Sequence, residues 1–282
     1  DRPIWSFPAW FWDFNNDGAI DIFVGSYEII DGTGAVARSY LGLPFKGETL
    51  RLYQGDGKGG FQEVSRQQKL TQLSLPMGAN FGDLDNDGYS DFYLGTGYPN
   101  YEALMPNLMY RNQAGQGFAD VTTAGGFGHL QKGHGVVFAD LDNDGDQDVF
   151  EQMGGAFPGD SFGDVLFENP GFENHWLKVK LIGHKTNKAA IGARIRATIT
   201  ENEAKRDIFL YVNSGGSFGA SPLRKELGLG KATVIDQLEI RWPTSGQVQT
   251  FQNVPVNVCL EIQENMQEYR KVSLPIISYP GK

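Results

Sequence analysis

The chain of 282 residues carries a formal net charge of −10, with 37 glycines and 12% aromatic residues. This length is sufficient for two domains with their own cores, and the composition, with few long helical patterns, favours an all-β protein. No basic stripe offsets the acidity, which argues against nucleic acid as a partner. Cys259 is the only cysteine, which excludes an internal disulfide, and no apolar run is long enough to span a membrane.

Three acidic loops recur along the chain, at 13–21, 83–91 and 140–148, and share the pattern D-x-[DN]-x-D-G-x-x-D. Side-chain oxygens stand at the first, third, fifth and ninth positions, and the seventh residue can add its backbone carbonyl. Gly18, Gly88 and Gly145 stand at the sixth position, where a residue without Cβ turns most easily. Flexible, oxygen-only loops suit Ca²⁺, which takes roughly 6–8 oxygen ligands. One match could be a solvated acidic turn, but three matches predict three calcium sites.

Each predicted calcium site is made by one loop, and its role is structural because the ion neutralises carboxylates that would otherwise repel one another. The predicted ligands are Asp13, Asn15, Asp17, Asp21 and the Ala19 carbonyl in the first loop; Asp83, Asp85, Asp87, Asp91 and the Tyr89 carbonyl in the second; and Asp140, Asp142, Asp144, Asp148 and the Asp146 carbonyl in the third. Three Ca²⁺ would offset a large part of the net negative charge.

An EF-hand begins with the same spacing, but it requires a bidentate Glu at the twelfth position and helices on both sides. The twelfth positions here are Val24, Leu94 and Glu151, and short β-branched and aromatic runs flank the loops. Such runs are typical of strands. The loops are therefore predicted to join β-hairpins, with Glu151 an ordinary strand residue.

The cellular location is predicted from the loops. Calcium loops of this modest charge fill best where calcium is abundant, outside the cytosol. We therefore expect a secreted, periplasmic or cell-surface protein. The chain begins at Asp1, which suggests either a processed protein or a fragment.

The repeat extends beyond the loops. An aromatic position recurs every 57 residues at Tyr53, Tyr110 and Phe167. From the first Asp of the loop to this position there are 27 residues in the second and third copies and 40 in the first, so a 13-residue insertion lies within 25–48. A fixed period of this size indicates stacked or radial repeats.

Each copy is predicted to form four short antiparallel strands, A to D, as in a β-propeller blade. Alternation of strand direction places the calcium loops (A–B) and the glycine-rich turns (C–D) at one end. The B–C loops, at 25–48, 96–106 and 154–163, then lie at the opposite end.

Three blades do not close a ring, because propellers need four to eight. Residues 1–172 are therefore predicted to be a partial propeller, completed by upstream blades or by another chain. Trp5, Trp10 and Trp12 are costly to leave in water. We expect the segment from Trp5 to Trp12 to pack against that preceding blade.

The last third of the chain, 173–282, is predicted to be a separate β-sandwich of about six strands. Arg194, Arg196 and Arg241 alternate with apolar residues, as expected of a strand face in water. Trp176 and Trp242 are interpreted as core residues. The predicted strands lie at 176–183, 193–201, 207–212, 234–242, 247–254 and 258–263.

Two resemblances follow from these motifs. The loops with their flanking strands resemble the FG-GAP/VCBS repeats of integrin-α-type propellers. The C-terminal part resembles the ASPIC/UnbV domain at Asn174–Leu181, Ala190–Arg196, Ser214–Phe218, Leu227–Gly230, Ile240–Pro243 and Gly246–Phe251. The combination resembles bacterial members of the cartilage acidic protein 1 family over essentially the whole chain. This resemblance implies upstream blades in one seven-bladed ring.

Catalytic motifs are sparse. No nucleophile elbow or phosphate loop is present, and His129 and His134 have a spacing that a turn before a strand explains as well as a metal site does. Carboxylates in or beside the B–C loops could form a glycosidase-like pair, but their separation is not fixed by sequence. They are Glu28, Asp31, Glu102, Asp160 and Asp164.

The B–C loops also carry aromatic residues that suit a binding surface for protein or glycan. The alternative is that they pack against the C-terminal domain or against neighbouring loops. The candidates are Tyr27, Tyr40, Tyr98, Tyr101, Phe157 and Phe162. The sequence thus favours a calcium-stabilised extracellular interaction protein of the adhesion or assembly-subunit type, with no catalytic residue assigned. The alternative is a propeller-based carbohydrate-active lyase or hydrolase.

Overall fold

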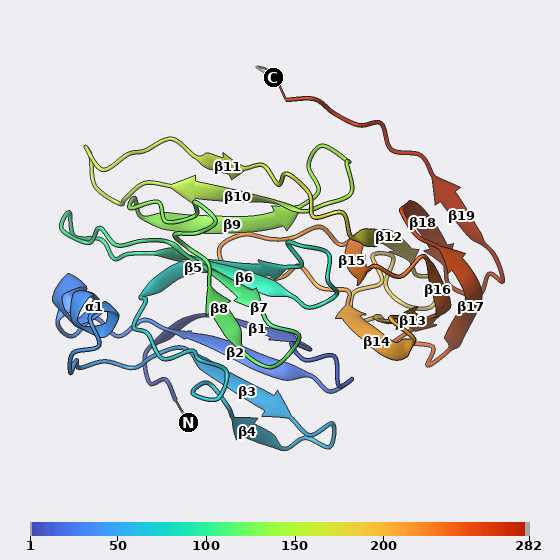
Figure 1. Ribbon diagram of the computed structural model, residues 1–282, viewed down its shortest axis with the longest axis horizontal. Coiled ribbons are helices and arrows are strands. Elements are labelled where there is room, and N and C mark those ends of the chain that lie inside the picture. The colour runs from blue at the N-terminus through green and yellow to red at the C-terminus, as the bar shows by residue number, and fades with distance from the viewer. Residues whose placement is uncertain (1, 280–282) are drawn as a thin grey trace.

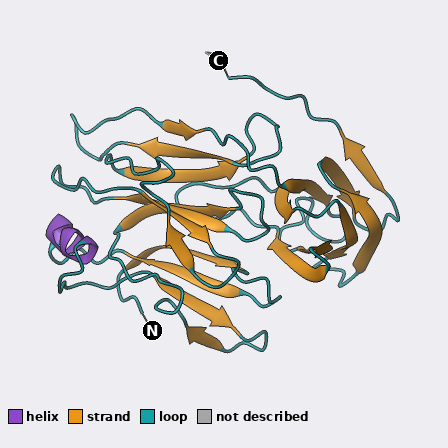
Figure 2. Ribbon diagram, in the orientation of Figure 1, coloured by secondary structure: helices purple, strands orange, loops and turns teal. Residues whose placement is uncertain are grey.

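The computed structural model of the chain describes residues 2–279, and these form five β-sheets and one short helix (Figures 1 and 2). The sheets are arranged in the manner of a β-propeller, and the prediction of an all-β fold is confirmed. Three of them carry the acidic loops, and we call these the loop-bearing sheets. The other two follow the last loop and are called the C-terminal sheets.

The first loop-bearing sheet contains four antiparallel strands, each pairing with the next along the chain. Its strands are β1 (Ser6–Trp12), β2 (Asp21–Ser26), β3 (Arg51–Gly55) and β4 (Phe61–Glu63). The insertion predicted between the second and third strands contains the helix α1 (Gly32–Tyr40). Ala35 and Val36 of α1 pack against Leu73, Leu75 and Tyr98, which fixes the helix at the B–C end of the sheet.

The second sheet repeats the four-stranded pattern, but the third has only three strands, so the predicted fourth strand of the third copy is wrong. After the third strand the chain turns at Asn169 and Pro170 toward the C-terminal sheets instead of returning. The strands are β5 (Pro76–Gly82), β6 (Asp91–Thr96), β7 (Leu108–Asn112) and β8 (Phe118–Asp120), then β9 (Gly133–Ala139), β10 (Asp148–Met153) and β11 (Val165–Phe167).

The C-terminal sheets contain eight strands rather than the six expected. One sheet has the order β15-β12-β18-β19 and the other the order β14-β13-β16-β17, and β12 pairs in parallel with β18. The bounds are β12 (His175–Ile182), β13 (Arg194–Glu201), β14 (Ala204–Tyr211), β15 (Lys225–Gly230), β16 (Val234–Arg241), β17 (Val248–Pro255), β18 (Val258–Gln263) and β19 (Tyr269–Val272).

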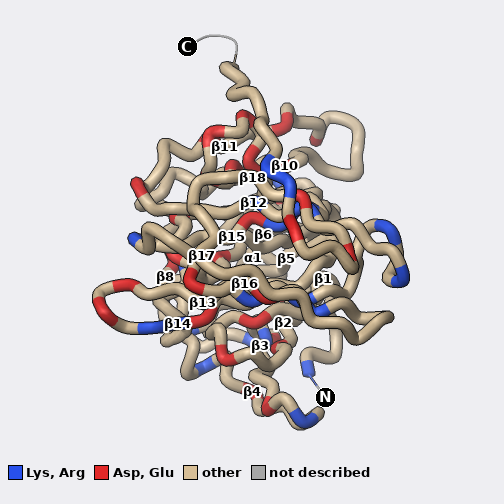
Figure 3. The backbone as a smooth tube through the Cα atoms, turned by 90° about the vertical axis from the view of Figure 1, so that its right-hand side faces the viewer, with Lys and Arg blue, Asp and Glu red and all other residues tan. Residues whose placement is uncertain are grey.

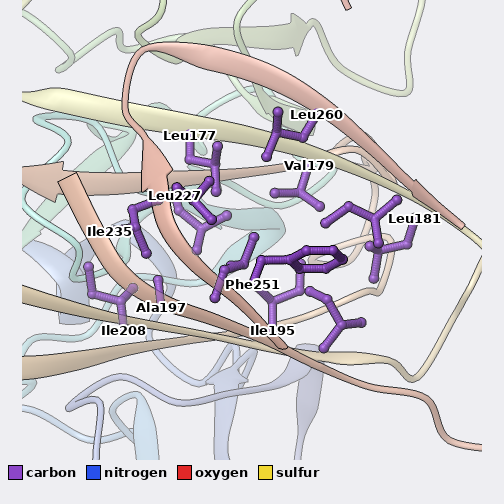
Figure 4. Packing of buried hydrophobic residues seen from close by; sticks show 14 of the residues in the cluster. Leu177, Val179, Leu181, Ile195, Ala197, Ile208, Leu227, Ile235, Phe251 and Leu260 are labelled. Carbon is purple, nitrogen blue, oxygen red and sulfur yellow. The ribbon is translucent and has the colours of Figure 1, made fainter. Parts of the chain in front are cut away.

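Both C-terminal sheets contribute to one apolar core (Figure 4). Leu177 and Val179 of β12 meet Ile195 of β13 and Phe251 of β17, with Trp242 fully buried beside them. The placement of Trp242 in the core follows the expectation. Trp176 lies instead at the border with the third loop, where its indole is close to Gly145.

The expected count of three blades is wrong, because five sheets are present in the described residues. The sequence count relied on the acidic loops, and the C-terminal sheets lack them. Because the C-terminal sheets have no recurring turn motif, the sequence shows no repeat period from which they could be counted as blades. These strands were expected to form a β-sandwich, and the two C-terminal sheets do pack around one core.

The first and second loop-bearing sheets share an aromatic core. Trp10 is 4% exposed and stacks on Phe23 at 4.0 Å between ring centroids, and Trp12 is 3% exposed and stacks on Phe118 at 5.8 Å. The expectation that Trp10 and Trp12 pack against a preceding blade is therefore wrong. Side chains alternate across β1, and these two point toward the second sheet.

The opposite face of the first sheet, which carries Phe11 and is called the leading face, is open. Phe11, Phe81 and Phe138 each stand two residues before the first Asp of a loop. Phe81 contacts the rings of Trp10 and Trp12, and Phe138 is fully buried against the second sheet. Phe11 is 60% exposed. In the second and third sheets the equivalent Phe packs against the preceding sheet. Among the described residues, no such sheet covers Phe11 on the leading face.

The C-terminal sheets cover the acidic-loop end of the loop-bearing sheets, while α1 lies at the far end (Figure 1). Phe209 N–H donates to Asn16 Oδ1 of the first loop, and Arg206 donates to the Asp87 carbonyl of the second. Basic and acidic residues alternate over the C-terminal sheets (Figure 3), where Arg196 pairs with Asp207. In the part of the chain described, no helix is long and apolar enough to cross a membrane.

Candidate functional site

The three acidic loops share two internal hydrogen bonds. The first Asp of each accepts the N–H of the sixth-position glycine through Oδ2, at 2.8 Å in all three loops. The fifth Asp accepts the N–H of the seventh residue through Oδ1, at 2.8, 2.8 and 3.2 Å. These bonds hold the carboxylates in place.

The ninth Asp closes each loop on its sheet. In the second loop, Asp91 accepts the N–H of Leu84 through Oδ2 at 2.9 Å and that of Asn112 through Oδ1 at 2.7 Å. Asp21 and Asp148 do the same with the equivalent residues of their copies. Each loop is therefore tied both to its own start and to the end of the third strand.

Carboxylates converge in the second and third loops. The oxygens of Asp83, Asp85 and Asp91 lie within 4.8 Å of one another, as do those of Asp140, Asp142 and Asp144. Three buried oxygens of these loops have no hydrogen-bond partner among the described residues, namely Asp85 Oδ1, Asp140 Oδ1 and Asp146 Oδ1. Orphaned buried carboxylate oxygens are costly and require a cation or an unseen donor.

Burial and mutual repulsion disfavour the charged forms of these carboxyls. The pKa of Asp13 is raised to about 7, mainly by burial and also by the charges of Asp21 and Asp17. Burial also raises the pKa of Asp83 and of Asp91 well above the ordinary value, with Asp87 and Asp85 the leading like-charged neighbours respectively. A bound divalent cation would reverse this penalty.

The donor set fits calcium. The predicted ligands are all oxygens, and clustered carboxylates with orphaned oxygens match a hard cation of high coordination number. Cations from the chain itself also approach the loops. Arg111 contacts Asp85 at 2.6 Å, and the buried Lys178 of β12 pairs with Asp140. Burial lowers the pKa of Lys178 to about 8.

The fourth position of each loop was not assigned from sequence, although all three residues are Asn. Asn16, Asn86 and Asn143 have positive φ, which Asn tolerates well. Asn16 Nδ2 donates to the Gly88 carbonyl at 2.8 Å, and Asn86 Nδ2 to the Gly145 carbonyl at 3.1 Å. The first and the second loop thus each bind the sixth-position glycine of the loop that follows.

The C-terminal segment replaces a following loop at the end of this series. Asn143 Nδ2 donates to the Pro275 carbonyl at 3.0 Å, and Ile277 N–H donates to the Asp142 carbonyl at 2.7 Å. Tyr279 Oη donates to Asp148 Oδ2 at 3.1 Å. The segment after β19 therefore covers the third loop.

The aromatic residues of the B–C loops do not form one surface. Tyr101 and Phe157 lie together at 5.6 Å between centroids, and Phe162 contacts His129. Tyr98 is buried against α1, and Tyr27 contacts Phe7. Tyr40, on α1, is partly exposed. In the part of the chain described, no ring contact joins these residues to the C-terminal sheets, which lie at the other end.

The carboxylates considered for catalysis are held by different partners. Asp160 pairs with the buried Lys132, Asp164 accepts the Met153 N–H, and Asp31 stands at the start of α1. Glu102 accepts from Asn100. No recorded contact joins two of these five carboxylates. His129 Nδ1 accepts the Gln131 N–H, which is the contact of a turn.

Glu151 lies in strand β10, as expected, but its carboxyl is buried. It is 0% exposed and accepts hydrogen bonds from Tyr93 Oη at 3.0 Å and Asn107 Nδ2 at 3.2 Å. Burial raises its pKa to about 8. The repeat itself indicates that Glu151 is buried. The equivalent positions in the other copies are the apolar Val24 and Leu94, and Leu94 is fully buried.

Replacing Glu151 by Gln is expected to flatten the dependence of stability on pH. The folded-state pKa of about 8 lies above the ordinary glutamate value of 4.5, so the stabilising contribution is complete below pH 4.5 and lost as the pH rises through 8. Between pH 5 and pH 9 the wild type should lose about 4 kcal/mol more than Glu151→Gln, from about 1.36 kcal/mol for each of the roughly three pH units between 5 and 8.

Urea denaturation in excess calcium at both pH values measures this difference. Glu102→Gln, at an exposed position of a B–C loop, is the matched control and should behave as the wild type. Equal pH dependence in the wild type and Glu151→Gln would contradict a neutral, buried carboxyl.

The fold and the loops define an all-β protein with FG-GAP-type repeats, and two families match the chain. The FG-GAP-like repeat matches residues 13–94, and the ASPIC and UnbV family matches residues 183–268. This domain composition is the one inferred from the motifs.

Comparisons with whole proteins add little. No curated protein matches the chain. A solved structure from Bacteroides ovatus ATCC 8483, for which a cell-adhesion role has been suggested, is 12% identical with a TM-score of 0.22. The match covers 61% of this chain and 80% of that one.

Proposed function

We propose that the protein is a calcium-stabilised extracellular binding protein, of the adhesion or assembly-subunit type, without catalytic activity. Three Ca²⁺ bind in the three acidic loops and have a structural role. The orphaned carboxylate oxygens of Asp85 and Asp140 support this metal assignment. Abundant calcium outside the cytosol suits a secreted, periplasmic or cell-surface location.

The single observation that carries the binding function is the exposed leading face of the first sheet. Phe11 is 60% exposed where Phe81 and Phe138 of the later copies are packed by the preceding sheet. Phe11, Ile20 and Phe61 line a groove of about 520 Å³ on this face. Exposed apolar patches of this kind mark interaction sites.

The partner that fits this face is another sheet of the same repeat type. Such a sheet would pack on Phe11 as the first sheet packs on Phe81, and it comes from upstream blades or from another chain. The aromatic residues of the B–C loops, such as the Tyr101–Phe157 pair, supply a second surface that a glycan could use.

The chain divides at residue 172 in this proposal. Residues 1–172 form the calcium-dependent part and 173–282 the ASPIC/UnbV part, with the C-terminal sheets packed around their own core. A binding role is favoured over a carbohydrate-active enzyme because the Asp160 carboxylate is engaged by the buried Lys132.

Phe11→Lys tests the proposal in the full chain. The wild type is expected to bind the apolar dye ANS and to associate at increasing concentration, as measured by fluorescence and by light scattering after size exclusion. The variant should lose both, with stability changed by no more than about 0.5 kcal/mol, because Phe11 is exposed.

Phe157→Lys is the matched control, since Phe157 is an exposed Phe on a B–C loop. It should leave association unchanged. If Phe11→Lys and the wild type bind ANS and associate equally, the leading face is not the docking surface.

A further inference from the structure

The loop between β14 and β15, Asn213–Ser221, leaves the C-terminal sheets and reaches the loop-bearing sheets. It contacts their first strands, β1, β5 and β9, which are edge strands in the order of each sheet. Ser217 forms an antiparallel bridge with Ala79 of β5, with both N–H···O distances at 2.9 Å. The loop thus provides hydrogen-bond partners for the edge strands β1, β5 and β9.

The three sheets meet this loop at the same position of the repeat. Ala9, Ala79 and Val136 each stand four residues before the first Asp of an acidic loop. Ala9 N–H donates to Ser217 Oγ at 3.3 Å, Ala79 N–H to the Ser217 carbonyl at 2.9 Å, and Val136 N–H to the Phe218 carbonyl at 2.8 Å. Two adjacent residues therefore satisfy three equivalent donors.

A buried amide extends this contact. Asn80, which is 0% exposed, accepts the Gly216 N–H through Oδ1 at 2.7 Å and donates to the Val136 carbonyl through Nδ2 at 2.9 Å. One side chain therefore links β5, β9 and the loop.

The glycines of the loop leave no room for a side chain. A Cβ at Gly216 would lie 1.9 Å from the Ala79 carbonyl oxygen, and one at Gly219 would lie 2.0 Å from that of Val136. Backbone atoms cannot move aside as a flexible side chain can. The Ser-Gly-Gly-Ser-Phe-Gly sequence is thus what permits the loop to approach the strand edges.

We propose that Asn213–Ser221 is an axial docking element, which binds the inner edge of every loop-bearing sheet at one register position. Through it the C-terminal sheets fix the arrangement of the blades. Ser217 and Phe218 act through their backbone groups, Ser217 also through its hydroxyl. This role concerns contacts within the chain and is independent of any partner at the leading face.

Amide hydrogen exchange of the full chain in calcium tests the proposal. In the wild type the amides of Ala9, Ala79 and Val136 should be protected. Gly216→Val should raise exchange at all three by tenfold or more, while amides of β10 stay protected. Gly163→Val is the matched control, because a Cβ there meets nothing within 4 Å, and it should leave all three unchanged.

Ser217→Ala provides a milder variant in case Gly216→Val does not fold. It removes one hydroxyl acceptor and should raise exchange at Ala9 alone, by about fivefold to tenfold for one lost hydrogen bond. Ala79 and Val136 use backbone carbonyls and should not change. Unchanged exchange at Ala9 in Ser217→Ala, or at all three in a folded Gly216→Val, would overturn the proposal.

Discussion

Removal of calcium is expected to produce the largest loss of stability of any change considered for this protein. A ligand that binds only the folded state stabilises it by RT ln(1 + [L]/Kd), about 2.7 kcal/mol per site at a hundredfold excess. Three sites would then contribute about 8 kcal/mol. EDTA should therefore lower the Tm strongly and expose the acidic loops to proteases, and excess Ca²⁺ should reverse both effects.

Single variants locate the effect in the loops. Asp85→Asn removes charge from a cluster with an orphaned oxygen, and it should reduce calcium stoichiometry by one in titration calorimetry. Asp56→Asn is the matched control, since Asp56 is an exposed carboxylate in a glycine-rich turn outside the loops. Fewer than two equivalents of Ca²⁺ in the wild type, or a Tm that EDTA leaves unchanged, would contradict the metal assignment.

Trp12→Ala is expected to cost about 3–5 kcal/mol, the range for truncating a buried aromatic residue to Ala. Trp12 is 3% exposed and contacts Phe81, Phe92 and Phe118 of the second sheet. The substitution would leave a cavity between two sheets, neither of which can close on it without losing its contacts with the other. Urea denaturation with calcium present measures the loss.

Trp5→Ala serves as the comparison, because Trp5 is 66% exposed in the same segment. It should change stability by no more than about 0.5 kcal/mol. A loss of about 3 kcal/mol or more for Trp5→Ala as well would mean that a partner covers Trp5 in solution, and a loss below about 1 kcal/mol for Trp12→Ala would contradict its packing against the second sheet.

The sequence by itself determined the features that depend on local chemistry. The acidic pattern places Asp and Gly at fixed positions of a turn, so the hairpins around 13–21, 83–91 and 140–148 follow from it. The 57-residue period gave the strand order within the first two sheets and the place of the insertion that contains α1. The C-terminal motifs matched their family for the same reason, since each is a short contiguous run.

Only the tertiary structure decided which surfaces meet. The alternation along β1 separates Trp10 and Trp12 from Phe11, but it does not state which face the next sheet covers. Glu151 is buried because Tyr93 and Asn107, far away in sequence, provide its hydrogen bonds. The contact of Ser217 with β5 joins residues more than a hundred positions apart, and no local pattern carries such a pairing. Contacts of this kind depend on how the sheets pack as whole bodies, which is a property of the folded chain and not of any segment.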